Sequence, residues 1–187
     1  MDHFNDISDL SKKNQRTIKR LWKQKPVFVD AITGLHDAIE GRFYREHPDF
    51  VSPGWSKPTY EVNGLVPEGK LGAYANPKEL LLESFGDQEI HVEKGTRVKG
   101  TRTGSHVHER GGITFVMRGK GSITDAIQGE PNSRYSKGEF YYMPANIPMA
   151  AANLTDYNVT LMDLFITPMG SPTMTVIEPG YPGYSLT

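Results

Sequence analysis

Two histidines one residue apart are the side chains of this sequence best suited to do chemistry. His106 and His108 flank a single valine, and alternate residues of a β-strand point to the same face of a sheet. Two imidazoles on one face can share a divalent metal ion, or one of them can act as a general base near neutral pH. The sequence contains six histidines and no cysteine, so a metal site must use imidazole and oxygen ligands.

The composition excludes several other kinds of function. In 187 residues, 21 Lys and Arg stand against 22 Asp and Glu, so the overall charge favours neither nucleic acid nor an anionic membrane as a partner. The absence of cysteine excludes disulfide scaffolds, thiol nucleophiles and iron–sulfur clusters. The acidic start at residues 1–6 is unlike a secretory signal, and no apolar run is long enough to span a membrane. We therefore expect a cytoplasmic protein.

Short strands separated by glycine and proline turns must position the two histidines. We expect strands at residues 89–93, 106–108, 113–117, 121–127, 140–143, 149–153 and 159–166. Strands at a spacing of about ten residues are typical of a β-sandwich or a small barrel. The run 80–82 suits either a buried strand or the first turn of a helix that 76–79 would cap.

The first 70 residues have a different character. Apolar residues recur at helical spacing over 7–22, and a second helix is expected from an N-cap at Asp30 to His47, which precedes a proline. Residues 49–70 are rich in proline and glycine and are predicted to form an arm, with a short strand at 60–62.

The segment around the histidine pair resembles the first motif of the cupin superfamily. In that motif a glycine precedes His-x-His, and a glutamate and a second glycine follow; Gly100, His106, His108 and Gly119 match it. Gly138, Pro144 and Asn153 stand at the spacing of the second motif. The resemblance covers residues 85–170 and implies a jelly-roll β-barrel with both histidines facing inward. We therefore expect a mainly β protein, with a helical extension and arm at 1–70 and a cupin barrel at 71–187.

Two of the four metal ligands of the family are missing. Gly112 stands where the motif has its glutamate, and Met149 stands where the third histidine belongs. A thioether is a weak ligand for divalent metals that prefer nitrogen and oxygen. Other residues would have to complete the site; the candidates are His36, His47, His91, Glu109, Tyr142 and Asp163.

Three kinds of site remain open. His106 and His108 could hold a divalent metal with a substitute ligand, and iron suits a set of two histidines and one carboxylate. The pocket could instead work without metal, as in cupin-like sugar epimerases, with a histidine as base and Tyr141 or Tyr142 as acid. The barrel could also bind a small molecule without transforming it.

The motif also predicts the lining of the pocket. Its usual register places Thr114, Val116, Phe140 and Tyr142 inward, facing Met149. With a carboxylate and an imidazole lost, the pocket should favour a partly apolar organic molecule over a sugar nucleotide or a phosphate.

The sequence thus predicts a small cupin enzyme that acts on such a molecule inside the barrel. Its catalytic residues would be His106, His108 and Tyr142. The reaction would be an iron-dependent oxygenation (a dioxygenase), or an isomerisation, cyclisation or lyase step. A binding protein without catalysis and a metal-free isomerase are the alternatives, and the resemblance implies a homodimer.

Overall fold

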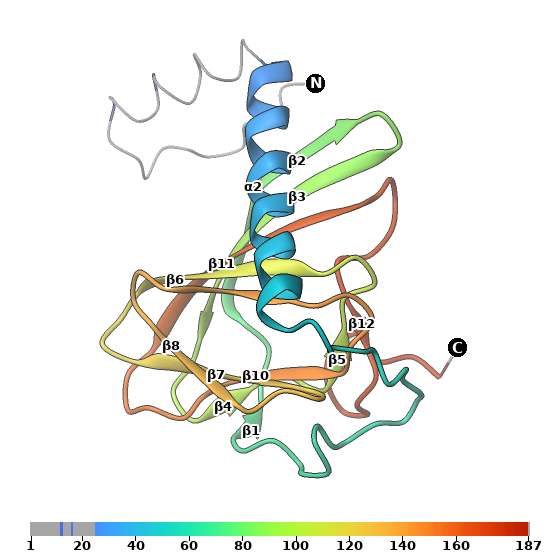
Figure 1. Ribbon diagram of the computed structural model, residues 1–187. Coiled ribbons are helices and arrows are strands. Elements are labelled where there is room, and N and C mark those ends of the chain that lie inside the picture. The colour runs from blue at the N-terminus through green and yellow to red at the C-terminus, as the bar shows by residue number, and fades with distance from the viewer. Residues whose placement is uncertain (1–11, 13–15, 17–24, 187) are drawn as a thin grey trace.

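Alternating apolar side chains and glycine turns divide residues 70–176 into strands of two sheets, with a helix packed against one of them (Figure 1). The computed structural model describes residues 12, 16 and 25–186. The described helix is α2, Lys25–Glu46. Among the described residues, no helix has the length and apolar character that crossing a bilayer requires.

The first sheet is antiparallel throughout and carries the helix on its outer face. Its strand order is β2–β3–β11–β6–β9. These strands are β2 Ala75–Phe85, β3 Gln88–Arg97, β11 Val159–Pro168, β6 Gly112–Arg118 and β9 Phe140–Met143.

The second sheet faces the first across the core. Its order is β1–β4–β10–β5–β12, and β7 joins β10 to β8. These strands are β1 Lys70–Leu71, β4 Thr101–Arg102, β10 Met149–Asn153, β5 His106–Val107, β12 Thr175–Val176, β7 Ser122–Ile127 and β8 Ser133–Ser136.

The first sheet buries apolar side chains on both of its faces. The inner side chains of β11 pack with those of β6, β7, β9 and β10 in the barrel core, which includes Leu161 and Phe165. The alternate residue Leu164 faces outward and packs with Val29 and Phe43 of α2. Because the helix removes this outer face from water, it stabilises the sheet as part of one structure.

The mainly β barrel predicted from the sequence is confirmed, and all seven predicted strands are present. The ambiguous run 80–82 is strand, because β2 continues the sheet and Leu81 packs under the helix. The predicted strand at 60–62 is wrong, since only Val62 forms a single bridge, to Leu65.

The N-cap predicted at Asp30 is also wrong. Helix α2 begins at Lys25 with a proline as its second residue, and proline is tolerated in the first turn because the N–H it lacks has no helical partner there. The helix ends at Glu46, as expected from His47-Pro48. The helix predicted over 7–22 falls almost wholly outside the described residues. The predicted division at 70/71 falls within β1 and stays a prediction.

Candidate functional site

Backbone carbonyl groups fix the orientation of both motif histidines. His106 Nδ1 lies 2.8 Å from the carbonyl oxygen of Gly104, and His108 Nδ1 lies 2.7 Å from that of Thr173. A carbonyl oxygen only accepts hydrogen bonds, so each Nδ1 carries the proton and each Nε2 keeps its lone pair. The rings lie edge to face, with centroids 4.9 Å apart.

Burial keeps this pair neutral. His106 is 4% exposed and His108 is 3% exposed. Loss of hydration lowers the pKa of His106 to about 3 and that of His108 to about 4. His108 Nε2 is buried and has no hydrogen-bond partner. Two neutral imidazoles are suited to bind a metal or accept a hydrogen bond, but they are weak bases.

Apolar side chains fill the positions where the family has its other two ligands. A Cβ atom on Gly112 would lie 2.4 Å from Cδ1 of Phe165, and the Phe165 ring stacks on His108 with centroids 4.8 Å apart. Met149 is 1% exposed and lies directly opposite His106 in the sheet. Phe165 and Met149 therefore enclose the histidine pair where a metal would need donors.

The substitute ligands considered from the sequence have other partners. Asp163 accepts hydrogen bonds from Thr114 at 2.7 Å and Tyr74 at 3.0 Å, and His47 lies 3.0 Å from Glu130. The other pairings are His91 with Thr167, Glu109 with Thr175, Tyr142 with Glu40, and His36 with Asp37 and Glu40.

The expected iron site needs a carboxylate or a third imidazole close to His106 and His108. Within the described part of the chain, the one group of three His, Asp or Glu side chains able to share an ion is His36, Asp37 and Glu40 on α2. His106 and His108 therefore lack a third imidazole or carboxylate. The residues present do not fit the two-histidine, one-carboxylate iron site.

The predicted orientation of Tyr142 and Phe140 is wrong. Tyr142 lies opposite Ile113 in the sheet, and both pack in the outer cluster beneath α2. The Tyr142 hydroxyl donates to Oε1 of Glu40 at 2.7 Å, and Phe140 is 40% exposed. Because side chains alternate along a strand, assigning the pairing one residue off exchanges the two faces. Tyr142 therefore does not face the motif histidines.

The neighbouring residues of β9 face inward instead. Tyr141 pairs with Thr114 and packs in the barrel core with Met143. Thr114, Val116 and Met149 are on the inner face, as expected. Their contact with a ligand stays a prediction.

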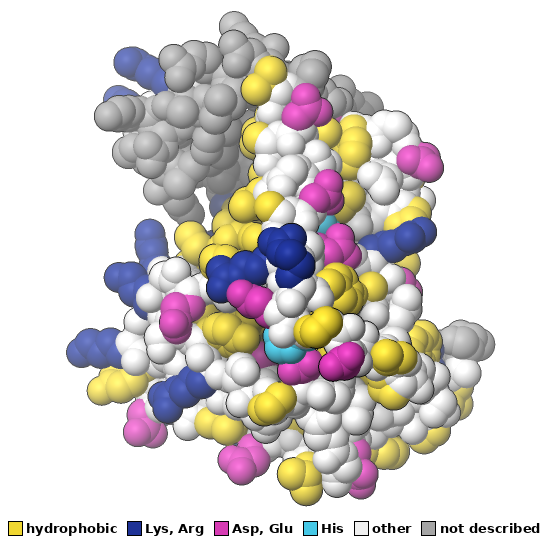
Figure 2. All heavy atoms as spheres, viewed as in Figure 1, with side chains coloured by type: hydrophobic (Ala, Val, Ile, Leu, Met, Phe, Trp, Pro, Cys, Tyr) yellow, Lys and Arg dark blue, Asp and Glu magenta, His cyan; other side chains and the backbone are white. Residues whose placement is uncertain are grey.

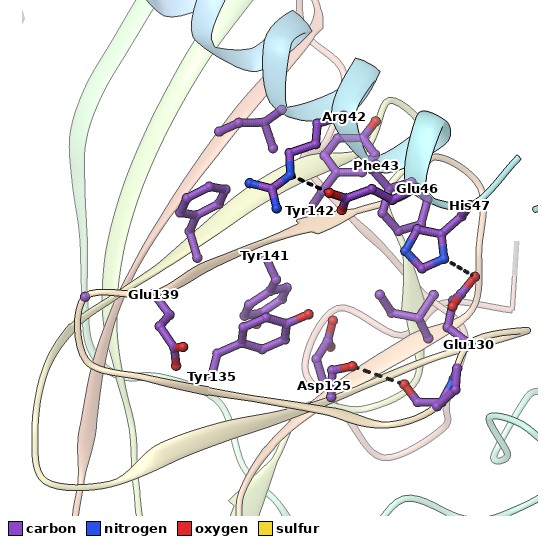
Figure 3. A pocket seen from close by; sticks show the side chains of 16 residues that line it. Arg42, Phe43, Glu46, His47, Asp125, Glu130, Tyr135, Glu139, Tyr141 and Tyr142 are labelled. Carbon is purple, nitrogen blue, oxygen red and sulfur yellow. Dashed lines mark hydrogen bonds and ion pairs between the residues drawn. The ribbon is translucent and has the colours of Figure 1, made fainter.

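A cavity of about 450 Å³ opens between the free edges of the two sheets, beneath the C-terminal half of α2 (Figure 3). Its floor comes from β7, β8 and β9, and its roof from helix residues including Arg42, Phe43 and Glu46. Acidic and basic side chains gather on the surface near this end of α2 (Figure 2). The motif histidines do not line this cavity.

Asp125 is the most unusual group in the cavity lining. It stands on β7 between Ile123 and Ile127, which pack in the barrel core, and it is 2% exposed. Its Oδ2 atom is buried and has no hydrogen-bond partner. Burial raises the pKa of this carboxyl to about 8, so it is mostly protonated at neutral pH.

Aromatic rings form the floor beside Asp125 (Figure 3). Tyr135 of β8 and Tyr141 of β9 stack with centroids 4.7 Å apart. Burial raises the pKa of both hydroxyls, and the charge of Asp125 raises each further. Both phenols therefore stay protonated at neutral pH.

Asp125 lies outside the motif residues from which the site was predicted. The signal available was its place in a predicted strand, where Ile123, Asp125 and Ile127 share one face. A carboxylate between two isoleucines on a core-facing strand is rare without a function or a partner.

No protein-family model matches the chain, and no curated protein matches its sequence. Similar solved structures include one of DMSP lyases, 25% identical over 44% of this chain and 42% of that chain, with a TM-score of 0.39. A cupin-like protein from Thermotoga maritima is 20% identical over 57% of this chain and 83% of its own, with a TM-score of 0.42. Oxalate oxidase in complex with glycolate is 16% identical over 49% of this chain and 46% of its own, with a TM-score of 0.39. The match thus covers less than half of the length of the DMSP lyase chain and of the oxalate oxidase chain.

Proposed function

We propose, from the motif residues that it retains and its two-sheet barrel, that the chain is a cupin and a metal-independent enzyme. It acts on a small, partly apolar organic molecule in the cavity beneath α2. Asp125 is its proton-transferring residue. The reaction is a proton-transfer step of the isomerase, cyclase or lyase kind.

The observation that carries this proposal is the unpartnered oxygen of Asp125. An uncompensated buried polar atom is costly, and such atoms concentrate where a ligand supplies the missing partner. A cavity of about 450 Å³ is within the size range of small-molecule sites. The carboxyl, the cavity and the aromatic floor therefore form one site.

The pKa of Asp125 suits it to general acid–base catalysis. A proton-transferring group is most effective when its pKa lies near the working pH, and burial sets that of Asp125 at about 8. The carboxylate takes a proton from an acidic position of the bound substrate, and the resulting carboxyl group returns a proton to a basic atom of it. Both steps conserve electrons, so the residues of the cavity can perform them without a redox partner.

The surrounding residues hold the substrate. Tyr135 and Tyr141 offer ring faces for its apolar part. The end of α2 borders the cavity with Arg42, which lies 2.8 Å from Glu46, and His47 lies 3.0 Å from Glu130 of the loop opposite.

A substrate screen with matched variants tests this function. Small metabolites are screened for binding by ligand-observed NMR, and bound compounds are followed for conversion with chelator-treated protein. Asp125→Asn keeps the shape and removes the proton, so it should lower turnover at least 100-fold. His106→Ala should leave the cavity and its chemistry in place.

Two outcomes would contradict the proposal. Turnover that is lost with His106→Ala and kept with Asp125→Asn would return the chemistry to the motif histidines. Cavity binding without any conversion would favour the alternative of a non-catalytic binding cupin. The homodimer and the cytoplasmic location expected from the sequence stay predictions, and sedimentation measures the first.

A further inference from the structure

The cavity is bordered by more carboxyl groups than basic groups. Four carboxyl side chains line it, namely Glu46, Asp125, Glu130 and Glu139, against the basic side chains of Arg42 and His47. Arg42 already pairs with Glu46, and His47 with Glu130. Asp125 and Glu139 are therefore left without a cationic partner among these lining groups. The site has no spare positive charge with which to hold an anion.

Three of the lining carboxyl groups lie near the aromatic floor of the cavity. Burial raises the pKa of the Tyr135 hydroxyl, and the charges of Asp125, Glu139 and Glu130 raise it further. Three carboxyl groups thus act on one ring of the cavity floor, and Tyr141 stacks on that ring. An aromatic face attracts a cation through its quadrupole, most strongly where water is excluded.

We propose that the ligand of this cavity carries a positively charged nitrogen, as an organic ammonium ion on a small apolar body. The ammonium group lies against Tyr135 and pairs with Oδ2 of Asp125. This inference rests on the proposed function only because it concerns the same cavity. It adds the chemical class of the ligand.

A bare metal ion fits the same residues poorly. The lining carboxyl groups are not among the described His, Asp or Glu side chains that come together closely enough to share one ion. The volume also exceeds what a single ion needs. An organic cation can reach separate carboxyl groups and fill the remaining space with its apolar part.

Binding of a cation must release a proton from Asp125. The charged or titratable groups that share its cavity are Arg42 and Glu46 of α2, His47 directly after it, Glu130 and Glu139 of the neighbouring loops, and Tyr135, Tyr141 and Tyr142 of β8 and β9. With a pKa of about 8, the carboxyl is mostly protonated at pH 7. An ammonium ion favours the carboxylate, so binding at pH 7 should be accompanied by proton release. The affinity should rise with pH up to about 8.

Calorimetry with matched probes tests the inference on the full-length protein. The cations are benzylammonium and tetramethylammonium; benzyl alcohol and tert-butanol are their neutral analogues, and benzoate is the anion. Titrations in two buffers of different ionisation enthalpy give the number of protons released, and Tyr135→Leu with protein NMR locates the bound probe. Asp87→Asn, at an exposed turn, is the control for Asp125→Asn.

We expect at least one ammonium ion to bind the cavity ten-fold or more tightly than its neutral analogue, with proton release that Asp125→Asn abolishes and Asp87→Asn leaves intact. Benzoate should not bind. Equal or tighter binding of the neutral analogues would overturn the charge assignment, while the turnover test of Asp125 would stand. Failure of all these probes to reach the cavity would also overturn it.

Discussion

Replacing Asp125 with asparagine should remove a large part of the pH dependence of folding stability. Burial raises the pKa of this carboxyl from 3.8 to about 8, so the folded state holds the proton more tightly than the unfolded state. The stabilisation is complete below pH 4, where both states are protonated. It is lost as the pH rises through 8, because the unfolded chain ionises freely and the folded one does so at a cost.

The magnitude follows from the size of the shift. Each pKa unit corresponds to about 1.4 kcal/mol, so a shift from 3.8 to about 8 amounts to roughly 6 kcal/mol lost between pH 4 and pH 8. The side chain is only 2% exposed, so solvent screening removes little of this. Asparagine has the same shape and no charge at any pH. The free energy of unfolding of Asp125→Asn, minus that of the native protein, should therefore be several kcal/mol larger at pH 8 than at pH 4.

The assay is urea denaturation at intervals from pH 4 to pH 9, with Asp87→Asn as the surface control. We expect the difference in unfolding free energy between Asp125→Asn and the native protein to grow with pH and to level off near pH 8. Parallel pH profiles for the two proteins would refute the reasoning, because they would show that Asp125 ionises in the fold as readily as in the unfolded chain.

Three further substitutions test the fold around the site by chemical denaturation. Gly112→Ala should cost about 1–3 kcal/mol, because its Cβ would lie 2.4 Å from Phe165, and Phe165→Leu should recover part of that loss; an unchanged midpoint would contradict the contact. Burial alone would raise the pKa of Glu178, but hydrogen bonds from Arg102 at 2.6 and 2.7 Å and from a backbone N–H outweigh it and lower the pKa. Glu178→Gln should therefore cost about 3–5 kcal/mol at pH 7 and less as the pH falls through the pKa of the native carboxyl; a cost independent of pH would argue against this pair. Tyr142→Phe removes a hydrogen bond to α2 and should cost about 1 kcal/mol, whereas a null effect would mean that water replaces it.

Local sequence was sufficient for seven of the strands and for the histidine pair. Gly119 and Gly138 adopt φ values of 122° and 91°, which strongly favour glycine, so such residues mark turns wherever they occur. The alternation of side chains along a strand predicted that His106 and His108 lie together; although β5 ends at Val107, the two rings lie 4.9 Å apart and both are buried.

The family motif failed where pairing between strands decides the outcome. Tyr142 was expected inside the barrel, but its partner in β6 is Ile113, on the outer face. The motif supplies residue types in order, whereas the register depends on the whole sheet and on the helix packed against it. Gly112 and Met149 showed which ligands were missing, but only the fold shows Phe165 filling the first of these positions.

The sequence by itself thus determined the barrel, its turn positions and an incomplete pair of metal-type histidines. Tertiary structure decided where the cavity lies and which carboxyl group has a strongly raised pKa. Asp125 is ordinary in sequence, and its raised pKa comes from burial between strands distant along the chain, which removes its hydration. Because desolvation depends on every element that surrounds a group, the pattern of one strand does not determine it.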